Sequence, residues 1–467
     1  MPTSPTIFWF RRDLRLADNP ALVEAATLGD GAVAPVFIVD PRFANPAGPA
    51  RAQYLRASLE ALDESLGGSL IVRYGEPSAE LLALARELGS TCVVATSDFA
   101  PLGLRRDEHV ARVLAGEGID LRYVDSNYVV APGIITTKSG SPCRVFGAYR
   151  RAWEMTTPPS PLEAPRVHWR EASGVGLEVL GDASARVRPR YFGDLPDGPP
   201  RQTWRAGEVA AHERLADFVT VAGAYGELRD APGEDATSRL SPFLRFGALH
   251  PRQVIAATSR VSGGDRSFAT EICWRDFYAD VLFHNPDSVS NVLQPAMAKL
   301  RVDRDEAAVR RFQVWARGET GYPLVDAGMR QLLDEGWMHN RVRMVVASFL
   351  VKHLHLDWRW GAKWFMWRLI DADLASNQHG WQWTAGTGTD AAPFHRVFNP
   401  TLQARRYDPE GIYIRRHVPE LASIEAPQCF EPGGGGLFSP ASYPAPMLDL
   451  NAERLEALAR FAQARSG

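Results

Sequence analysis

Three side chains suited to ligand binding share one face of a helix expected over residues 267–285. Glu271, Trp274 and Arg275 lie at positions i, i+3 and i+4, so a helix brings them together. A carboxyl beside an indole and a guanidinium can hold a heteroaromatic ligand by stacking and hydrogen bonding. The same residues can equally form a salt bridge packed under the indole. The spacing alone leaves both interpretations open.

A second polar group is expected on two later helices. Asn340, Arg343 and Met344 share a face of the first, because they too lie at i, i+3 and i+4. Asp371 and Asp373 are expected at the end of the other helix. A pair of Arg343 with Asp371 would be a charge-assisted contact able to grip the polar edge of a ring.

A third group is the run ATSRLSP over residues 236–242, which offers hydroxyls and backbone N–H groups just before an expected helix. The positive end of a helix favours phosphate, so the run could hold one. It is also an ordinary N-cap pattern. Tyr225, upstream, is a weak signal by itself. All three groups lie in one helical region without a competing acid–base or nucleophile arrangement.

Tryptophan is concentrated in residues 358–383, where six indoles stand among acids, amides and arginines. Aromatic residues at helical spacing most often indicate a packed core. A purely structural core rarely needs so many polar groups, so a binding pocket is the alternative. His353 and His355 are two residues apart and cannot both face one site on a helix, which makes them structural or surface residues. No histidine spacing predicts a metal site.

The composition is typical of a globular protein with two or three domains. The 467 residues are 45% hydrophobic and 23% charged, with a net charge of −3. The four cysteines contain no CxxC pair, which indicates neither a disulfide framework nor a zinc site. The first apolar run is too short for a signal peptide, and no run is long enough to span a membrane. We therefore expect a cytoplasmic protein.

The chain is expected to divide into an α/β part and a helical part. Short runs rich in Val and Ile alternate with helical patterns, which predicts a parallel, Rossmann-like sheet. No GxGxxG follows the first strand, so the dinucleotide fingerprint is absent. We expect an α/β domain over residues 1–130, a Pro- and Gly-rich connector over 131–203, and an all-α domain over 204–467. The predicted strands are residues 6–10, 32–40, 69–75, 91–98 and 121–126, and predicted helices include residues 144–153, 337–354, 362–375 and 450–466.

Long motifs of this chain resemble the photolyase/cryptochrome family, in the family's order and over nearly the full length. FWFRRDLRLADNPAL resembles the family's opening, and ATSRLSPFLRFGALHPRQV, TGYPLVDAGMRQL, GWMHNRVRM and DWRWGAKWFMWRLIDADLASNQHGWQW resemble its flavin domain. Within the family, the chain resembles the class I enzymes that act on cyclobutane pyrimidine dimers. The resemblance implies a light-driven carbon–carbon lyase, FAD bound in the all-α domain, and UV-damaged DNA as the partner of a monomeric protein.

The resemblance also implies roles for residues at matching positions. The FAD diphosphate region would be held by Tyr225, Thr237, Ser238, Arg239, Leu240 and Ser241. The other parts of FAD would be surrounded by Arg275, Trp337, Asn340, Arg343, Asp371, Asp373 and Asn377. The flipped-out dimer would be bracketed by Trp274 and Trp383 and hydrogen-bonded by Glu271 and Asn340, while Arg229, Arg341 and Arg396 would contact DNA phosphates.

Two positions discriminate within the family. Asn377 is expected to face the flavin N5, where a neutral amide tolerates an anionic reduced flavin and an Asp, as in plant cryptochromes, would repel it. Met344 matches enzymes acting on cyclobutane dimers, whereas the (6-4) branch resembles a His-containing sequence there. Cyclobutane repair is therefore the preferred hypothesis. A cryptochrome-type photoreceptor, a (6-4) photolyase and a flavin- or nucleotide-binding protein without light chemistry are the alternatives.

One expected electron-transfer residue is missing. The family commonly reduces its flavin through three tryptophans, of which Trp381 and Trp358 match the first two. The third would fall near Asp305, so the electron path must stop short or leave through Trp360, Trp364 or another aromatic residue. The α/β domain of the family can also hold an antenna. Residues 103–108 (GLRRDE) look closer to deazaflavin-type members than to folate-type ones, with an empty pocket as the alternative.

Overall fold

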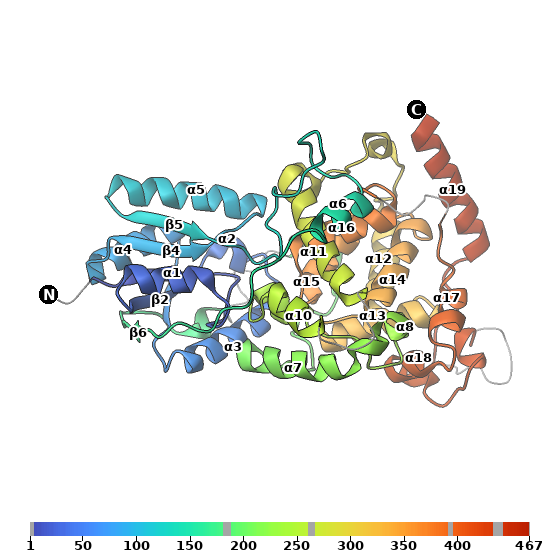
Figure 1. Cartoon of the computed structure of the whole chain (residues 1–467). Coiled ribbons are helices and arrows are strands. Elements are labelled where there is room, and N and C mark those ends of the chain that lie inside the picture. The colour runs from blue at the N-terminus through green and yellow to red at the C-terminus, as the bar shows by residue number, and fades with distance from the viewer. Residues whose placement is uncertain (1–3, 181–187, 260–266, 391–395, 433–441, 467) are drawn as a thin grey trace. The chain divides into compact units, whose positions relative to one another are not determined.

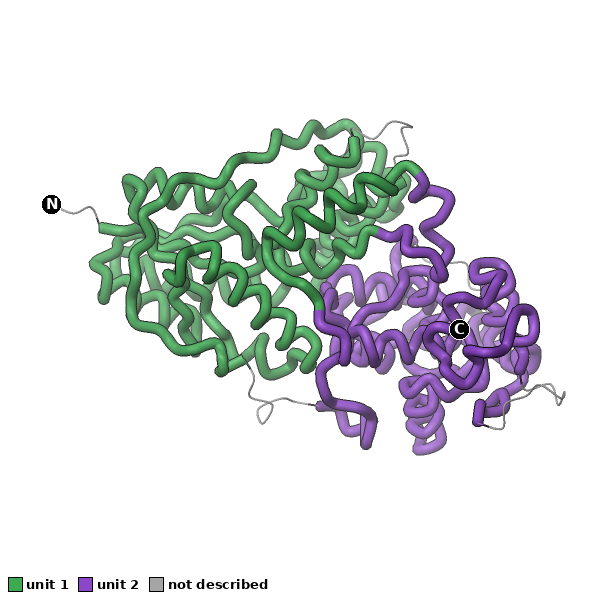
Figure 2. Tube along the Cα trace, turned by 90° about the horizontal axis from the view of Figure 1, so that it is seen from below, with its two compact units in different colours: residues 1–187, 204–223, 238–286 green, residues 188–203, 224–237, 287–467 purple. Residues whose placement is uncertain are grey.

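The computed structural model describes residues 4–180, 188–259, 267–390, 396–432 and 442–466. The chain forms two compact units (Figure 2). Unit 1 comprises residues 1–187, 204–223 and 238–286, and unit 2 comprises residues 188–203, 224–237 and 287–467. Parts of the helical region thus belong to unit 1, so these units do not follow the boundaries at residues 130 and 203 that composition suggested. Those boundaries stay a prediction.

Unit 1 is built on a parallel sheet with the strand order β3-β2-β1-β4-β5, as the alternating pattern predicted. A short additional strand, β6, pairs with β2 in parallel; its two residues are too few for a sequence pattern to reveal. The strands are β1 (Thr6–Phe10), β2 (Ala32–Val39), β3 (Ile71–Tyr74), β4 (Cys92–Thr96), β5 (Asp120–Val124) and β6 (His168–Trp169).

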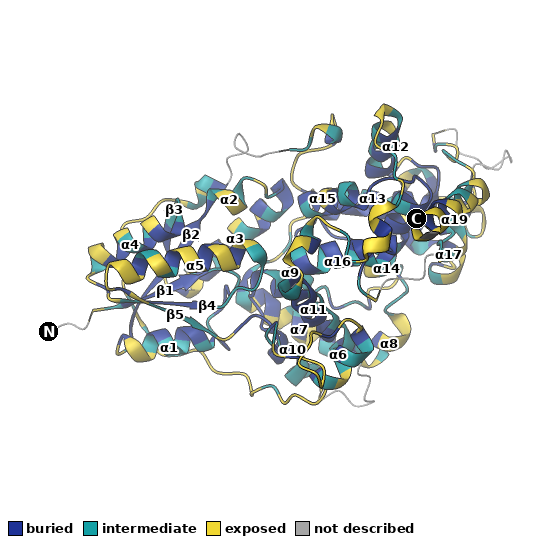
Figure 3. Ribbon diagram, turned by 90° about the horizontal axis from the view of Figure 1, so that it is seen from above, coloured by how far each residue is buried: buried dark blue, intermediate teal, exposed yellow. Residues whose placement is uncertain are grey.

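Helices cover both faces of this sheet (Figure 1). Ile7 and Trp9 of β1 point to one face and pack with Leu81 of α4 and Val110 of α5, whereas α1 contacts β1 and β4 from the other side. The outward side of α5 is exposed (Figure 3). The helices between the strands are α1 (Pro20–Leu28), α2 (Pro41–Ala44), α3 (Pro49–Ser65), α4 (Pro77–Leu88) and α5 (Pro101–Gly116).

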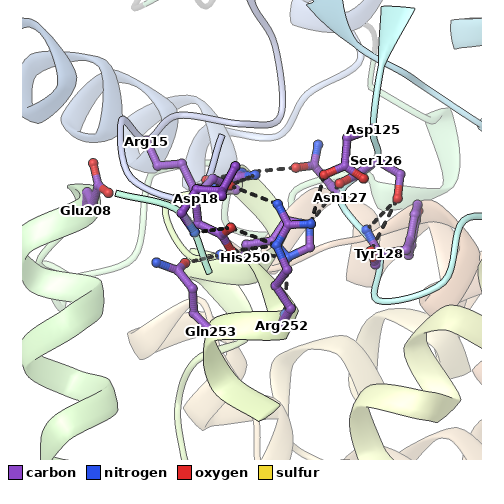
Figure 4. A network of polar contacts seen from close by, with 12 residues as sticks. Arg15, Asp18, Asp125, Ser126, Asn127, Tyr128, Glu208, His250, Arg252 and Gln253 are labelled. Atoms are coloured by element: carbon purple, nitrogen blue, oxygen red, sulfur yellow. Dashed lines mark hydrogen bonds and ion pairs between the residues drawn. The ribbon is translucent and has the colours of Figure 1, made fainter. Parts of the chain in front are cut away.

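A buried polar network joins the turn after β1 to the helical part of unit 1 (Figure 4). Arg252 donates to both carboxylate oxygens of Asp18 at 2.7 and 2.9 Å, and Arg15 donates to Asn127 at 3.1 Å. His250 Nδ1 accepts from a backbone N–H and Nε2 lies 2.9 Å from the Ser126 carbonyl, which fits a neutral ring; burial lowers its pKa well below the usual value. The helices of this part are α6 (Phe146–Trp153), α7 (Gly207–Val221), α9 (Ser241–Phe246), α10 (Pro251–Thr258) and α11 (Ser267–His284).

Unit 2 is helical around one large aromatic core that includes Trp315, Trp364 and Trp381. One predicted helix is wrong: residues 362–375 do not form a single helix, because α15 ends at Arg368 and α16 starts at Leu374. Asp371 therefore lies in the link instead of at a helix end. The helices are α8 (Tyr225–Leu228), α12 (Glu306–Arg317), α13 (Pro323–Glu335), α14 (Asn340–Lys352), α15 (Trp358–Arg368), α16 (Leu374–Ala385), α17 (Pro400–Tyr407), α18 (Ile412–His417) and α19 (Leu450–Ser466).

Candidate functional site

The link between α15 and α16 presents a charged pair. Arg343 of α14 donates to Asp371 Oδ2 at 2.8 Å and to the Met338 carbonyl at 2.8 Å. The other oxygen, Asp371 Oδ1, is buried, and within the described part of the chain no group donates to it. A buried carboxylate oxygen without a donor is costly unless a ligand supplies one. The pair predicted from sequence is confirmed, and its remaining acceptor fits a bound ring with an N–H or O–H group.

Asn377 on α16 has a defined amide orientation. Its Nδ2 lies 3.1 Å from the Ala362 carbonyl and 2.8 Å from Gln378 Oε1. A backbone carbonyl can only accept, so the NH₂ group must point to α15, and Oδ1 is directed elsewhere as an acceptor. Asp373 caps the helix by accepting from the Ser376 N–H at 3.1 Å. The link thus fixes α16 so that Asn377 presents a carbonyl oxygen.

The N-terminal turn of α14 carries further predicted residues. His339 caps the helix by accepting from the Arg341 N–H at 3.2 Å. Trp337 is buried, with the Arg343 guanidinium 6.0 Å from its ring. Arg341 forms a two-pronged contact with Asp230 at 3.1 and 2.7 Å. Because Asp230 already neutralises Arg341, a DNA phosphate that contacts Arg341 would have to share its guanidinium with Asp230.

The tryptophans of unit 2 form a chain of ring contacts. Trp381 lies 6.2 Å from Trp315 between ring centroids, Trp315 lies 5.7 Å from Phe312, and Phe312 lies 5.8 Å from Trp360. Trp360 is half-buried and stacks on Tyr191 at 4.7 Å. The position of the third expected tryptophan, near Asp305, holds the N-cap of α12. Sequence reasoning named Trp360 as one possible exit but could not find Trp315 or Phe312 as the links.

The remaining predicted residues of unit 2 lie at its edges and in its core. Trp358 is buried, and its Nε1 has no acceptor among the residues described. Trp383 is half-buried, and Arg396 is exposed. The Asn340 and Met344 positions follow the expected spacing on α14. Tyr225 begins α8 and has the Arg229 guanidinium 6.0 Å from its ring. Thr237 is the last residue of the segment 224–237 that belongs to unit 2.

Unit 1 contributes α11, where Glu271, Trp274 and Arg275 share a face as predicted. The guanidinium of Arg275 donates to the carbonyls of Asn127 at 2.7 Å and Leu244 at 3.3 Å. It is thus fixed by backbone acceptors instead of by Glu271. The Trp274 indole stacks on the Phe146 ring at 3.6 Å between centroids. No pattern along the chain predicted the contact between Trp274 and Phe146.

The turn before α9 holds the rest of the predicted phosphate-binding run. Arg239 adopts a positive φ of 50°, which is uncommon outside glycine. The Ser238 carbonyl accepts from Arg214 at 2.8 Å, and its hydroxyl lies 3.3 Å from the Leu240 N–H. Ser241 then begins α9.

A separate pocket of unit 1 lies at the carboxyl ends of β1, β4 and β5, where the strand order reverses, the usual ligand position in such sheets. Arg11 donates to Asp107 at 2.6 and 2.7 Å, and Arg106 donates to Asp98 at 3.2 Å. Arg106 and Asp107 of the GLRRDE motif are therefore buried in a charge network beside the pocket. Its lining consists of Arg11, Arg12, Thr96, Ser97, Asp98, Phe99, Asn127 and Tyr128.

Comparison with known proteins finds two family models that match this chain. Residues 6–166 match the family described as DNA photolyase, and residues 268–463 match the FAD binding domain of DNA photolyase. The deoxyribodipyrimidine photo-lyase of Agrobacterium fabrum is 40% identical over 99% of this chain and 98% of its own. That of Escherichia coli is 33% identical over 99% of each chain. The chain belongs to the DNA photolyase family.

Solved structures show the same fold. A class III photolyase from Agrobacterium tumefaciens superposes with a TM-score of 0.89 at 38% identity, covering 100% of this chain and 99% of its own. A cryptochrome from Synechocystis superposes with a TM-score of 0.84 at 28% identity, covering 98% and 100%. Membership in class I stays a prediction. No helix among the described residues is long and apolar enough to cross a membrane.

Proposed function

We propose that this protein repairs cyclobutane pyrimidine dimers in DNA with light, using bound FAD. The observation that carries the proposal is the orientation of Asn377, whose Nδ2 is tied to the Ala362 carbonyl at 3.1 Å. A neutral acceptor at Oδ1 suits a reduced flavin, which carries a proton on N5, and it adds no negative charge beside an anionic ring. Relatives named deoxyribodipyrimidine photo-lyase support the same activity.

When bound and excited by light, reduced FAD would donate an electron to the dimer, the cyclobutane ring would open, and the electron would return to the flavin. The protein's residues bind and orient, and they need no base or nucleophile. Asp371 Oδ1 would accept a hydrogen bond from the cofactor, and Arg343 balances the charge of this carboxylate. The residues that we propose for FAD binding are Tyr225, Thr237, Ser238, Arg239, Leu240, Ser241, Arg275, Trp337, Asn340, Arg343, Asp371, Asp373 and Asn377.

The flipped-out dimer is held by side chains with complementary chemistry. Trp274 and Trp383 stack on its bases, Glu271 and Asn340 hydrogen-bond it, and Met344 contacts it. The cations that meet DNA phosphates are Arg229, Arg341 and Arg396, which makes binding dependent on salt. We expect damaged DNA to bind one copy of the chain in the cytoplasm.

The test is to reduce the purified protein, add DNA with a thymine dimer, illuminate with blue light and measure the dimers that remain. Asn377→Asp should lower the yield of repair while FAD stays bound, because a carboxylate repels the anionic ring. Asn451→Asp, at an exposed residue of α19, is the matched control. If reduced wild-type protein with bound FAD leaves the dimers intact, the repair activity is disproved, and a cryptochrome-type photoreceptor becomes the better assignment.

We further propose that photoreduction uses Trp360 as its surface end. After Trp381 has given an electron to light-excited oxidised FAD, it would take one from Trp315, and Trp315 would take one from Trp360 across Phe312. The positive charge would then lie on Trp360, where an added thiol reduces it. Tyr191 does not take over the charge, because its hydroxyl is buried without an acceptor among the described residues and burial raises its pKa. Trp360→Phe should shorten the lifetime of the tryptophan radical after a flash, whereas Trp358→Phe leaves it unchanged if the path runs through Trp315.

We propose a deazaflavin-type antenna in the pocket at β1 and β4. Arg11 and Arg106 are paired with Asp107 and Asp98 beside this pocket, so the proposal rests on the resemblance of GLRRDE, residues 103–108, to deazaflavin-type members. An archaeal relative of 28% identity, from Sulfolobus tokodaii, is described with two FAD molecules, so a second flavin is the competing occupant. Mass spectrometry of the chromophores released from the native protein distinguishes deazaflavin, a second FAD, folate and an empty pocket.

A further inference from the structure

Trp274 of α11, a predicted dimer-binding residue, stacks on the ring of Phe146. This is the closest ring contact among the described residues around the predicted dimer-binding side chains of α11. The two ring centroids are 3.6 Å apart and the planes differ by only 9°. Aromatic pairs usually sit 4.5–7 Å apart in offset or edge-on geometry. Phe146 therefore covers one face of the indole almost completely. Phe277 meets the edge of both rings, at 5.7 Å from each.

Phe146 belongs to α6, a short helix of the irregular segment between β5 and α7. The buried residues of α6 are all aromatic: Phe146, Tyr149 and Trp153 lie at i, i+3 and i+7 and face α11. Tyr149 packs on Phe277 at 5.3 Å. An eight-residue helix is too short to be stable by itself in water, so this contact with α11 decides its position.

Two buried carboxylates of α11 attach the same segment. Asp276 accepts from Trp153 Nε1 at 3.0 Å and from the Val130 N–H at 3.0 Å. One turn later, Asp280 accepts from the Gly133 N–H at 2.7 Å. These contacts hold both ends of the segment on α11, so the Phe146 ring is fixed against the indole from outside the helix that carries Trp274.

A stacking residue binds a flipped base best when its side chain is already in the binding position. An indole that must be immobilised during binding loses conformational freedom and weakens the complex. On α11 itself, Phe277 and Tyr278 meet the half-buried Trp274 indole at inclined angles of 71° and 44°. Of these three neighbouring rings, Phe146 is the one that lies flat on the indole and so restrains the orientation of its plane. We propose that Phe146 is a positioning residue that holds the Trp274 indole ready for the pyrimidine dimer and so increases selectivity for damaged over undamaged DNA. This inference rests on the proposed function of Trp274.

The test compares Kd for an oligonucleotide with one thymine dimer to Kd for the undamaged strand, in the FAD-loaded protein at fixed salt. Phe146→Leu keeps the site apolar but removes the flat ring, and we expect a loss of selectivity of roughly 3- to 10-fold, the cost of ordering one side chain. Phe146→Met, which introduces a flexible side chain of similar size, should reduce selectivity in the same way. It replaces Phe146→Leu in the test if the Leu variant does not fold. Tyr149→Phe is the control on the same helix face.

A double-mutant cycle separates positioning from a general structural effect. In a Trp274→Ala background, Phe146→Leu should change selectivity by less than twofold, because the ring that it positions is gone. Equal losses in both backgrounds would overturn the inference, as would full selectivity of both Phe146 variants. If Trp274→Ala itself keeps full selectivity, the assigned role of Trp274, and not the stacking argument, has failed. Dissociation constants for the undamaged strand should stay unchanged throughout.

Discussion

Gly361 of α15 offers a sharp test of how tightly the Trp381 indole is packed. A Cβ at this position would lie 2.1 Å from the Cη2 atom of Trp381, closer than real contacts allow. The indole cannot retreat easily, because it is 2% exposed and meets Phe365 at 5.0 Å and Trp315 at 6.2 Å. Gly361→Ala should therefore destabilise the protein despite the better helix propensity of Ala.

The magnitude follows from two opposing contributions. Alanine gains about 0.5–1 kcal/mol over glycine inside a helix, whereas overpacking a tight core costs about 1–3 kcal/mol. The net expectation is a loss of roughly 1–2 kcal/mol. Gly380 of α16 is the matched control, because a Cβ there meets nothing within 4 Å, and Gly380→Ala should stabilise by about 0.5–1 kcal/mol.

Urea denaturation of both variants measures the difference through the midpoint and slope of the transition. A displaced Trp381 should also slow photoreduction in the Gly361→Ala variant and leave repair by chemically reduced protein intact. The reasoning is refuted if the Gly361→Ala protein is as stable as the Gly380→Ala protein, since the close contact would then cost nothing.

Three further outcomes follow from buried polar groups. Tyr443→Phe should lower the free energy of unfolding by about 1–3 kcal/mol, because Asp326 Oδ2 then loses a hydrogen-bond donor at 2.6 Å. Urea denaturation measures this change. Tyr149→Phe is the control, because the Tyr149 hydroxyl has no hydrogen-bond partner among the described residues. Burial raises the pKa of Asp276 from 3.8 to about 6, so its proton stabilises the folded state fully below about pH 4, and this stability is lost as pH rises towards 6. The free energy of unfolding of the Asp276→Asn variant, measured by urea denaturation, should change less with pH between about pH 4 and pH 6 than that of the wild type. Tyr191→Phe should leave the flash-induced tryptophan radical unchanged, and a shorter lifetime would mean that the tyrosine takes part.

The sequence predicted the parallel sheet with strand ends correct to within two residues, because continuous apolar runs bounded by turns are a local signal. It also paired Arg343 with Asp371, because a guanidinium and a carboxylate on two expected helices can form a charge-assisted contact. It failed at residues 369–373, where apolar residues continue the helical pattern across a break. The capping oxygen of Asp373 and the Arg343 contact decide that break, and neither is visible as a period in the chain.

The sequence by itself determined the family, the fold class and the residue types available for flavin and dimer binding, because these depend on local patterns and long motifs. Only the tertiary structure decided which groups meet across long separations. Phe146 reaches Trp274 over more than a hundred residues, and Trp360 reaches Trp381 through Trp315 and Phe312. Such contacts arise when separate helices pack, and no period or spacing along the chain encodes which rings will touch.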